Sequence, residues 1–241
     1  MNATFDVDRA LSFINCQLRP SSPIRGHELT EVRGITISRQ SGCGAHFFAA
    51  NLAGGLQAHS PPGERPWTVF DRGLVEAVLQ DHHLPARLAS FMPEDRVGML
   101  NDIIEDLCSL HPPMESLVRR TSETILHLAE LGHAIIVGRG AHIITARLPG
   151  MLHIRLIGSV EVRLTHMLQI DHLERKDAVL RMEREDGGRR RYLKRYFGKD
   201  IDDPLQYHFV INTDWVSLEE AAHMICMFAQ SPAVTHATHV G

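Results

Sequence analysis

Lysine is almost missing from this chain of 241 residues. Its three lysines are Lys176, Lys194 and Lys199, so the other 22 of its 25 basic residues are arginines. The first 175 residues contain no lysine at all. An anion held by that part of the chain must therefore be bound by arginine, by histidine or by backbone N–H groups.

Paired cysteines are missing as well. The four cysteines are far apart and form no Cys-x-x-Cys pair, which excludes a zinc knuckle and a disulfide framework. We expect isolated, reduced and mostly buried thiols at the four positions, Cys16, Cys43, Cys108 and Cys226. The 16 histidines are scattered without ligand spacing, so the sequence predicts no metal site.

Long apolar runs and a leader sequence are also lacking. No apolar run approaches the roughly 20 residues that a membrane-spanning helix needs. The first residues include Asp6 and Asp8 where a signal peptide would have a basic start and an apolar core. A formal net charge of −4 gives no general attraction to nucleic acid or to anionic membranes. These absences predict a cytoplasmic protein without membrane contact, for which a nucleic-acid partner is not expected.

Short apolar runs alternate with helical patterns from residue 32 onward. Such alternation predicts a parallel sheet with helices on both faces, a three-layer α/β/α fold. A helix after the first strand should end at Gly54-Gly55, and later helices should be capped by Ser159 and by Ser217 with Glu220. The five expected strands span residues 34–38, 67–70, 134–137, 151–157 and 208–211.

Both ends of the chain are expected to lie outside the main domain, residues 32–230. Residues 1–31 have a short helical pattern that stops at a proline-rich stretch, and they are too few to bury a core of their own. We expect this extension to pack on the main domain or on a second subunit, which would make a homodimer. Residues 231–241 should form a flexible tail.

A loop rich in small residues follows the first strand. Helix N-termini at the carboxyl ends of parallel strands offer free N–H groups to ligands, and Gly42 and Gly44 permit the backbone to form an anion-holding nest. A plain tight turn is the alternative, because Gly-x-Gly often joins a strand to a helix. We call this segment the glycine loop: Ser38, Arg39, Gln40, Ser41, Gly42, Cys43, Gly44, Ala45 and His46.

Five segments in order resemble the cytidylate kinase-like family of P-loop nucleotide kinases. They are ITISRQSGCGAHFFAANLA, WTVFDRGLVEAV, AIIVGRGAHII, LHIRLIGSVEVRL and REDGGRRRYLKRYFGKDIDDPLQYHFVINT, which together cover residues 33 to 228. The resemblance implies the P-loop nucleotide-kinase fold, with a helical substrate-side insertion at about 72–132 and an arginine-rich helical lid at about 174–203. It also implies ATP and Mg²⁺ as cofactors and a small-molecule phosphate acceptor.

The chain departs from the Walker A pattern G-x-x-x-x-G-K-[ST]. Ala45 stands at the lysine position, His46 at the Ser/Thr position that holds Mg²⁺, and Arg39 at the first glycine. The family often lacks this lysine too. Arginines must then neutralise the phosphate charge, and no Mg²⁺ ligand can be named from the sequence.

Two candidate catalytic residues follow strands directly. Asp71 comes after the second expected strand, where a carboxylate could hold Mg²⁺ or orient the acceptor, or could cap the next helix. Arg139 lies between two glycines after a wholly apolar strand and could pair bidentately with phosphate through two nitrogens of its guanidinium. A structural salt bridge is the alternative for Arg139.

Residues 187–199, the arginine run, hold six basic residues and no acid. As part of a lid, they should repel one another while the site is empty and close over nucleotide phosphates. Arg181 and Arg189 are the expected catalytic cations, with Asp186, Arg190 and Lys199 as further lid residues. A solvated helix face or a nucleic-acid strip are the alternatives.

Two residues of the glycine loop carry hypotheses of their own. His46 could donate to phosphate or be an ordinary surface histidine. Cys43 should have a lowered thiol pKa at the helix N-terminus, but no base stands near it in the sequence, so a nucleophilic role is not expected.

Two functions remain open at this point. In the first, the protein transfers phosphate from ATP to a nucleoside monophosphate or a similar small acceptor, by positioning and charge neutralisation. In the second, it is a degenerate relative that binds a nucleotide or another anion as a sensor or scaffold.

Overall fold

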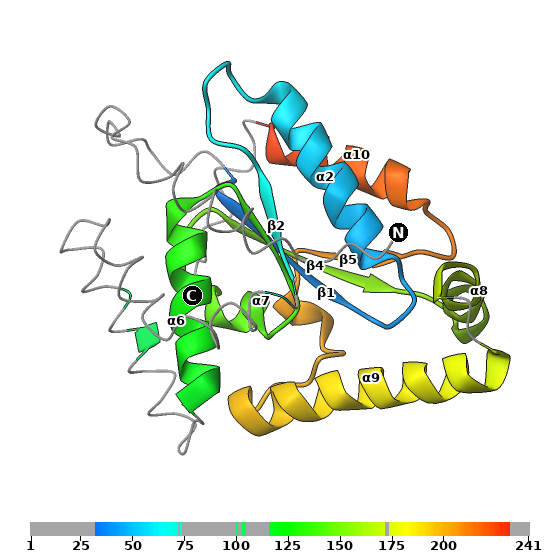
Figure 1. Cartoon of the computed structure of the whole chain (residues 1–241). Helices are drawn as coiled ribbons and strands as arrows, with labels where there is room; N and C mark the ends of the chain where they lie inside the picture. Colours follow the sequence, from blue (N-terminus) through cyan, green and yellow to red (C-terminus); the bar gives the residue numbers. More distant parts are fainter. Residues whose placement is uncertain are drawn as a thin grey trace.

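A parallel sheet forms the centre of the protein (Figure 1). The computed structural model describes residues 32–71, 73, 100, 103–104, 116–171 and 174–231. Within these residues the sheet has five strands in the order β2-β3-β1-β4-β5, all of them parallel. They are β1 Gly34–Arg39, β2 Thr68–Phe70, β3 Ala134–Val137, β4 Met151–Ile157 and β5 Phe209–Asn212. The predicted three-layer fold with five parallel strands is confirmed.

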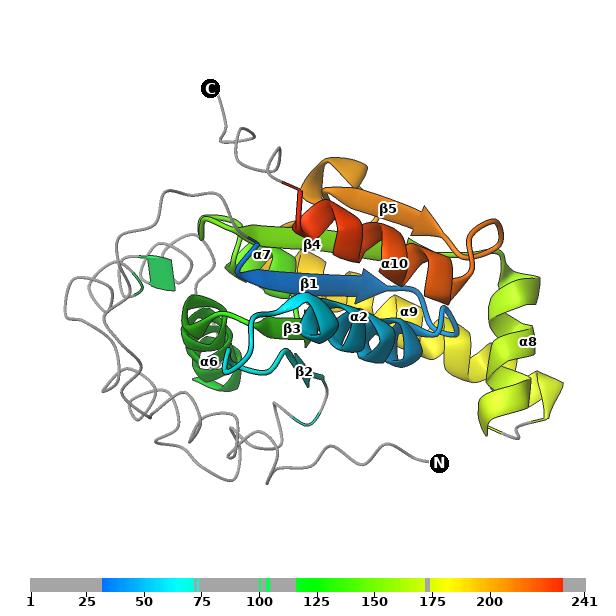
Figure 2. The ribbon, with the colours of Figure 1, turned by 90° about the horizontal axis from the view of Figure 1, so that it is seen from above.

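Helices cover both faces of the sheet, as Figures 1 and 2 show. Helices α2 (Ala45–His59) and α10 (Leu218–Ala229) lie together on one face, over a core that includes Phe48, Leu52 and Ile225. The other face is covered by α6 (Ser116–Leu131), α7 (Ala141–Ile144) and α9 (Arg175–Phe197). Helix α8 (Val160–Asp171) and a short 3₁₀ helix (Pro204–Gln206) complete the described elements.

Alternation along β4 explains why the sheet carries two cores. Leu152, Ile154 and Leu156 point into the core below α2 and α10. His153 and Arg155, which lie between them, point to the opposite face, as the two-residue period of a strand requires. Both histidine and arginine are buried there, so this face must satisfy their polar atoms internally.

The register of the strands brings three loops to one edge. Ile37 of β1 pairs with Val137 of β3 and with Ile154 of β4, so these strands end close together. The glycine loop, residues 138–140 and residues 158–159 therefore meet at the carboxyl edge of the sheet. Ligands bind at this edge in open α/β sheets.

Two expectations about helix ends have different outcomes. Helix α2 does not end at Gly54-Gly55 but continues to His59, so that prediction is wrong. Gly55 is instead a contact point, because a Cβ there would lie 2.6 Å from Sγ of Cys226 on α10. The capping box of Ser217 and Glu220 is confirmed, and Ser159 Oγ accepts from the N–H of Val162.

Parts of the expected organisation lie outside the described residues. They are the N-terminal extension 1–31, most of the insertion expected at 72–132, and the tail after residue 231. The domain boundaries therefore stay predictions. Within the described residues, no helix is both long and apolar enough to cross a membrane.

Candidate phosphate-binding site

The glycine loop wraps the start of α2, as predicted. Gly42 and Gly44 have φ angles of 85° and 67°, in the left-handed region that favours glycine. A Cβ on Gly42 would also lie 2.4 Å from the carbonyl oxygen of Arg163. Among the described residues no acceptor is assigned to the N–H groups of Gly42, Gly44, Ala45 and His46. This is the arrangement of a nest that accepts an anion.

Side chains and backbone beyond the loop hold it in place. The amide oxygen of Gln40 accepts from the N–H of Gly158, 3.0 Å away. The carbonyl oxygen of Ser41 accepts from Nη1 of Arg163, 3.1 Å away, and the Arg163 side chain is buried. The start of α8 thus fixes the loop conformation before any ligand binds.

Two other loop residues are built into the protein interior. Cys43 is buried, and burial raises the pKa of its thiol to about 11, so the expected lowering at the helix N-terminus is wrong. The hydroxyl of Ser38 accepts from Nη1 of Arg155 at 2.9 Å within the buried part of the sheet. Both residues therefore anchor the loop to the buried part of the protein.

Residues 138–140 form an unusual turn beside the loop. All three have positive φ angles, 87° for Gly138, 56° for Arg139 and 73° for Gly140. A Cβ on Gly140 would lie 2.8 Å from the ring of Phe197. Arginine in the left-handed region is uncommon, and such strain gathers at functional sites.

Arg39 reaches across the sheet edge to this turn. A Cβ on Gly138 would lie 2.2 Å from Nη1 of Arg39, so the guanidinium passes directly over the glycine. Burial, together with the positive charges of Arg189 and Arg139, lowers the pKa of Arg39 to about 10. Among the described residues no hydrogen bond or ion pair is assigned to the Arg39 guanidinium. The negative charges of Glu185 and Asp71 raise the pKa of Arg39 and offset this lowering in part.

Asp71 lies at the end of β2, on the same edge. Its Oδ1 accepts from the N–H of Gly73 at 3.0 Å, so it has the backbone-capping role named as one alternative. Its Oδ2 lies 3.2 Å from Nδ1 of His46, and the His46 side chain is 60% exposed. The negative charge of Asp71 also acts on Arg39. The loop, Arg39 and Asp71 are therefore brought together.

Helix α9 lies against the glycine loop through an acidic residue. Oδ1 of Asp186 accepts from the backbone N–H of Ser41 at 2.7 Å. Oδ2 of the same carboxylate lies 2.6 Å from Nη1 of the buried Arg163. The predicted role of Asp186 as a partner of the arginines fits these contacts.

Glu185 makes a second contact between α9 and the loop. Its Oε2 accepts from the Ser41 hydroxyl, its Oε1 from Nε of Arg181 at 2.9 Å, and Arg189 reaches Oε2 at 3.1 Å. Burial would raise the pKa of Glu185, but the hydrogen bonds from Ser41 and Arg181 and the charge of Arg189 lower it to about 2. Arg189 also donates to Asp186 at 2.9 Å.

The remaining lid candidates lie further from the loop. Arg190 donates through Nη2 to Asp202 at 2.8 Å, and Asp202 also accepts from the buried Arg155 at 2.5 Å. Lys199 is exposed, and no hydrogen bond or ion pair is assigned to it in the described ranges. Residues 175–197 form one helix, and acids on either side of the arginine run pair with two of its arginines, Arg189 and Arg190.

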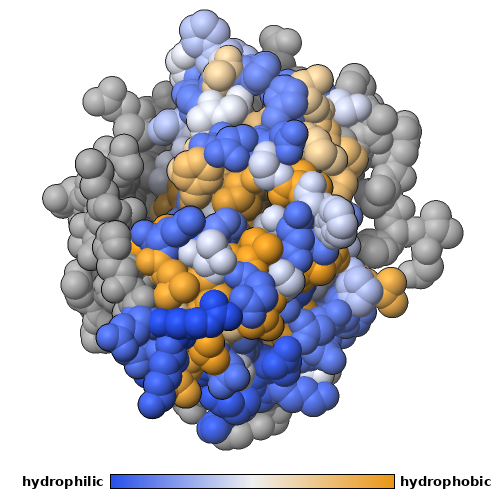
Figure 3. All heavy atoms as spheres, turned by 90° about the vertical axis from the view of Figure 1, so that its right-hand side faces the viewer, coloured by the Kyte–Doolittle hydropathy of each residue, from blue (hydrophilic) through white to orange (hydrophobic). Residues whose placement is uncertain are grey.

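Hydrophilic residues gather over the lower part of the face that Figure 3 shows, where α9 lies. A pocket of ≈ 580 Å³ lies beside the loop and is lined by Gln40, Arg155, Gly158, Asp202, Asn212 and Asp214, among others. Its size suits a small organic ligand. Sequence reasoning had not singled out Arg155, Arg163, Glu185 or Asp202, because their partners are distant in the chain.

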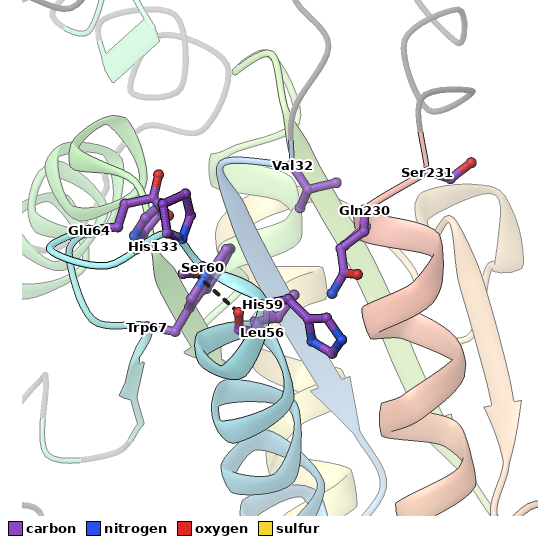
Figure 4. Close-up of a pocket in the computed structure, with 11 residues that line it drawn as sticks. Val32, Leu56, His59, Ser60, Glu64, Trp67, His133, Gln230 and Ser231 are labelled. Atoms are coloured by element: carbon purple, nitrogen blue, oxygen red, sulfur yellow. Dashed lines mark hydrogen bonds between the residues drawn. The ribbon is translucent and has the colours of Figure 1, made fainter.

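A second pocket lies away from the glycine loop, between the C-terminal ends of α2 and α10 (Figure 4). It encloses ≈ 420 Å³ and is lined in part by His59, Glu64, Trp67, His133 and Gln230. Trp67 and His133 are stacked at 4.9 Å. None of the predicted site residues lines it.

A buried polar cluster lies on the face of the sheet that α7 and α9 cover. His153 Nδ1 is 2.9 Å from Oγ1 of Thr36, and its ring lies 5.0 Å from that of His208. His142 of α7 contacts Tyr207, with ring centroids 4.8 Å apart. Burial lowers the pKa of His153 to about 3 and that of His142 to about 4.

We expect the free energy of unfolding to fall as the pH falls from 6.5 to 4. The unfolded chain takes up protons on these histidines near pH 6.5, whereas folded His142 and His153 stay neutral down to about 4 and about 3. Each contributes a loss of up to about 1.4 kcal/mol per pH unit in this window. Urea denaturation of His153→Gln should show a weaker pH dependence, and the exposed His223→Gln should match the wild type. An unchanged pH dependence in His153→Gln would contradict the assignment.

The model of the cytidylate kinase-like family matches residues 34–215. The chain belongs to this family. No curated protein matches it significantly.

Among solved structures, this chain resembles an uncharacterized protein from Eubacterium ventriosum. The TM-score is 0.63 at 20% identity, over 83% of this chain and 98% of that one. A shikimate kinase from Bacteroides thetaiotaomicron has a TM-score of 0.44 at 12% identity, over 83% of this chain and 99% of that one. TT1252 from Thermus thermophilus has a TM-score of 0.40 at 14% identity, over 83% of this chain and 100% of that one. The first of these similarities supports the fold and says nothing about a substrate.

The fit of Mg²⁺, which the family relationship suggests, can be tested on the described side chains. No group of three or more His, Cys, Asp or Glu among them could hold a metal ion. Both oxygens of Asp71 are engaged, and Ala45 and His46 offer no hydroxyl. These described residues do not fit a magnesium site.

Proposed function

We propose that this protein is an ATP-dependent phosphotransferase that acts on a nucleoside monophosphate or a similar small acceptor. The observation that carries the proposal is the position of Arg39. Its guanidinium lies beside the glycine loop, where the charges of Arg139 and Arg189 act on it and the acids Glu185 and Asp71 offset them only in part. A bound anion would stabilise this group of cations. Membership of a kinase-like family supports a nucleotide as that anion. A cytoplasmic location remains part of the proposal.

The chain's residues would act by positioning and by electrostatic stabilisation. The free N–H groups of the glycine loop would hold one phosphate group. Arg39, Arg139 and Arg189 would neutralise the charge that develops on the transferred group. Asp71, at the end of β2, would orient the acceptor. Helix α9 would exclude water. No covalent intermediate is needed.

The rival function is nucleotide or anion binding without transfer. Two observations favour it: the missing loop hydroxyl at His46, and the carboxylates of α9 that already contact the loop. Both functions share the same site and differ in turnover.

Screening ATP consumption against the nucleoside monophosphates should reveal turnover with at least one acceptor. Calorimetry of ATP binding belongs beside it, because binding alone is common to both functions. Arg139→Ala should lose the turnover, which excludes a contaminating kinase. Tight ATP binding without turnover under every acceptor tried would select the rival.

A further inference from the structure

The glycine loop already holds an anion, and the anion belongs to the protein. Two donors of Ser41 are engaged by α9: its N–H by Asp186 at 2.7 Å and its hydroxyl by Glu185. Backbone N–H and hydroxyl donors in a loop that leads into a helix are groups that bind phosphate oxygens. Part of the anion site is therefore occupied by carboxylates.

Glu185 and Asp186 also form ion pairs with the arginines next to the loop. Arg181 donates to Glu185 at 2.9 Å, and Arg189 donates to Glu185 at 3.1 Å and to Asp186 at 2.9 Å. Bidentate and paired contacts of this kind are what arginine makes with phosphate. A phosphate group that enters beside Ser41 finds the N–H of Ser41 and the side chains of Arg181 and Arg189 already engaged.

The ion pairs of Asp186 are more buried than those of Glu185. Asp186 also lies 2.6 Å from Arg163, whose side chain is only 8% exposed, so removing Asp186 would leave a buried charge unpaired. The Glu185 side chain is 30% exposed and pairs with Arg181 and Arg189, whose side chains are 41% and 24% exposed. Glu185 is the carboxylate that can leave at lower cost.

Helix α9 has a weak point directly after the acids. Gly187 and Gly188 follow Asp186 inside the helix, and a Cβ on Gly188 would meet nothing within 4 Å. Glycine in a helix interior costs about 1 kcal/mol relative to alanine, and glycine pairs are sites of bending. Close packing does not explain Gly188, whereas a bend that moves the acids would.

We propose that Glu185 is a built-in competitor of phosphate, which occupies Ser41, Arg181 and Arg189 until a phosphate-bearing ligand displaces it. The inference rests on the proposed function only in naming phosphate as the ligand. Because the site is open for only a fraction of the time, the apparent affinity for phosphate is reduced by that fraction. Arg189, the member of the arginine run that pairs with Glu185, would bind phosphate only after this carboxylate leaves.

Calorimetric titration of the full chain with pyrophosphate tests this competition. Glu185→Gln keeps the size of the side chain and removes its charge, so pyrophosphate should bind about tenfold more tightly than to the wild type. Glu183→Gln is the matched control, because Glu183 is exposed on the same helix and makes the same change in charge. The affinity of Glu183→Gln for pyrophosphate should lie within about twofold of that of the wild type.

A second variant guards against misfolding. Glu185→Asp keeps the charge and withdraws the carboxylate by one methylene group, so it should also bind pyrophosphate more tightly. Binding by both Glu185 variants that is equal to that of Glu183→Gln, or weaker than that of the wild type, would overturn the proposal, as would no binding by any of the four proteins.

Turnover separates this inference from the proposed function. If the Glu185 variants gain affinity and no protein transfers phosphate from ATP, the competitor stands and the phosphotransferase fails. If the wild type transfers phosphate and the Glu185 variants gain nothing, the competitor fails and the phosphotransferase stands.

Discussion

Replacing Arg39 with methionine should nearly abolish phosphate binding and, at the same time, stabilise the empty protein. The guanidinium is a partly buried cation beside two other arginines, and desolvation with their charges lowers its pKa to about 10. Methionine of similar length removes this unfavourable charge, for a gain of about 1–2 kcal/mol in the free energy of unfolding. Loss of a charge-assisted contact to phosphate should weaken pyrophosphate binding by about 3 kcal/mol, or about 100-fold.

Opposite signs for stability and binding are the diagnostic feature. A structural ion pair would lose stability on substitution, whereas a functional cation kept at a cost would gain it. Melting curves and pyrophosphate calorimetry measure the two quantities. Arg184→Met, at an exposed position of α9, is the control for the change in net charge and should alter neither by much. A large fall in the melting temperature of Arg39→Met would assign Arg39 a structural role.

The fold was predictable because its signals are local. Short apolar runs bounded by glycines, such as residues 134–137, indicate strands buried on both faces. The capping box at Ser217 marks a helix start within four residues. The wrong end of α2 shows the limit of local reasoning. Gly54-Gly55 has the composition of a helix end, but Gly55 is required by the approach of Cys226, 171 residues later in the chain.

The site was predictable only in part, for the same reason. The glycine loop and Arg139 are defined by glycines next to them in the sequence. The contact between Ser41 and Asp186 joins residues 145 positions apart, and no spacing rule announces it. The sequence pattern of the arginine run does not indicate that flanking acids pair with its arginines. The position of Cys43 at a helix start does not indicate the burial that raises its pKa.

The last prediction separates the side chain of Arg139 from its strained backbone. Arg139→Ala should weaken pyrophosphate binding by about 1.5–3 kcal/mol, the contribution of a charge-assisted hydrogen bond. Arg139→Gly should lose the same binding, since both variants lack the guanidinium. The two should differ in stability, because glycine adopts the observed φ of 56° without the cost that alanine keeps.

The expected difference in unfolding free energy is about 1 kcal/mol in favour of Arg139→Gly over Arg139→Ala. Chemical denaturation of the two variants measures it, and calorimetry measures the binding. Among the described residues no ion pair is assigned to Arg139, so neither variant should unfold at ordinary temperature. If pyrophosphate binding is unchanged in both variants while both melt much earlier, Arg139 belongs to a structural contact, and the arginine cluster at the loop loses one of its members.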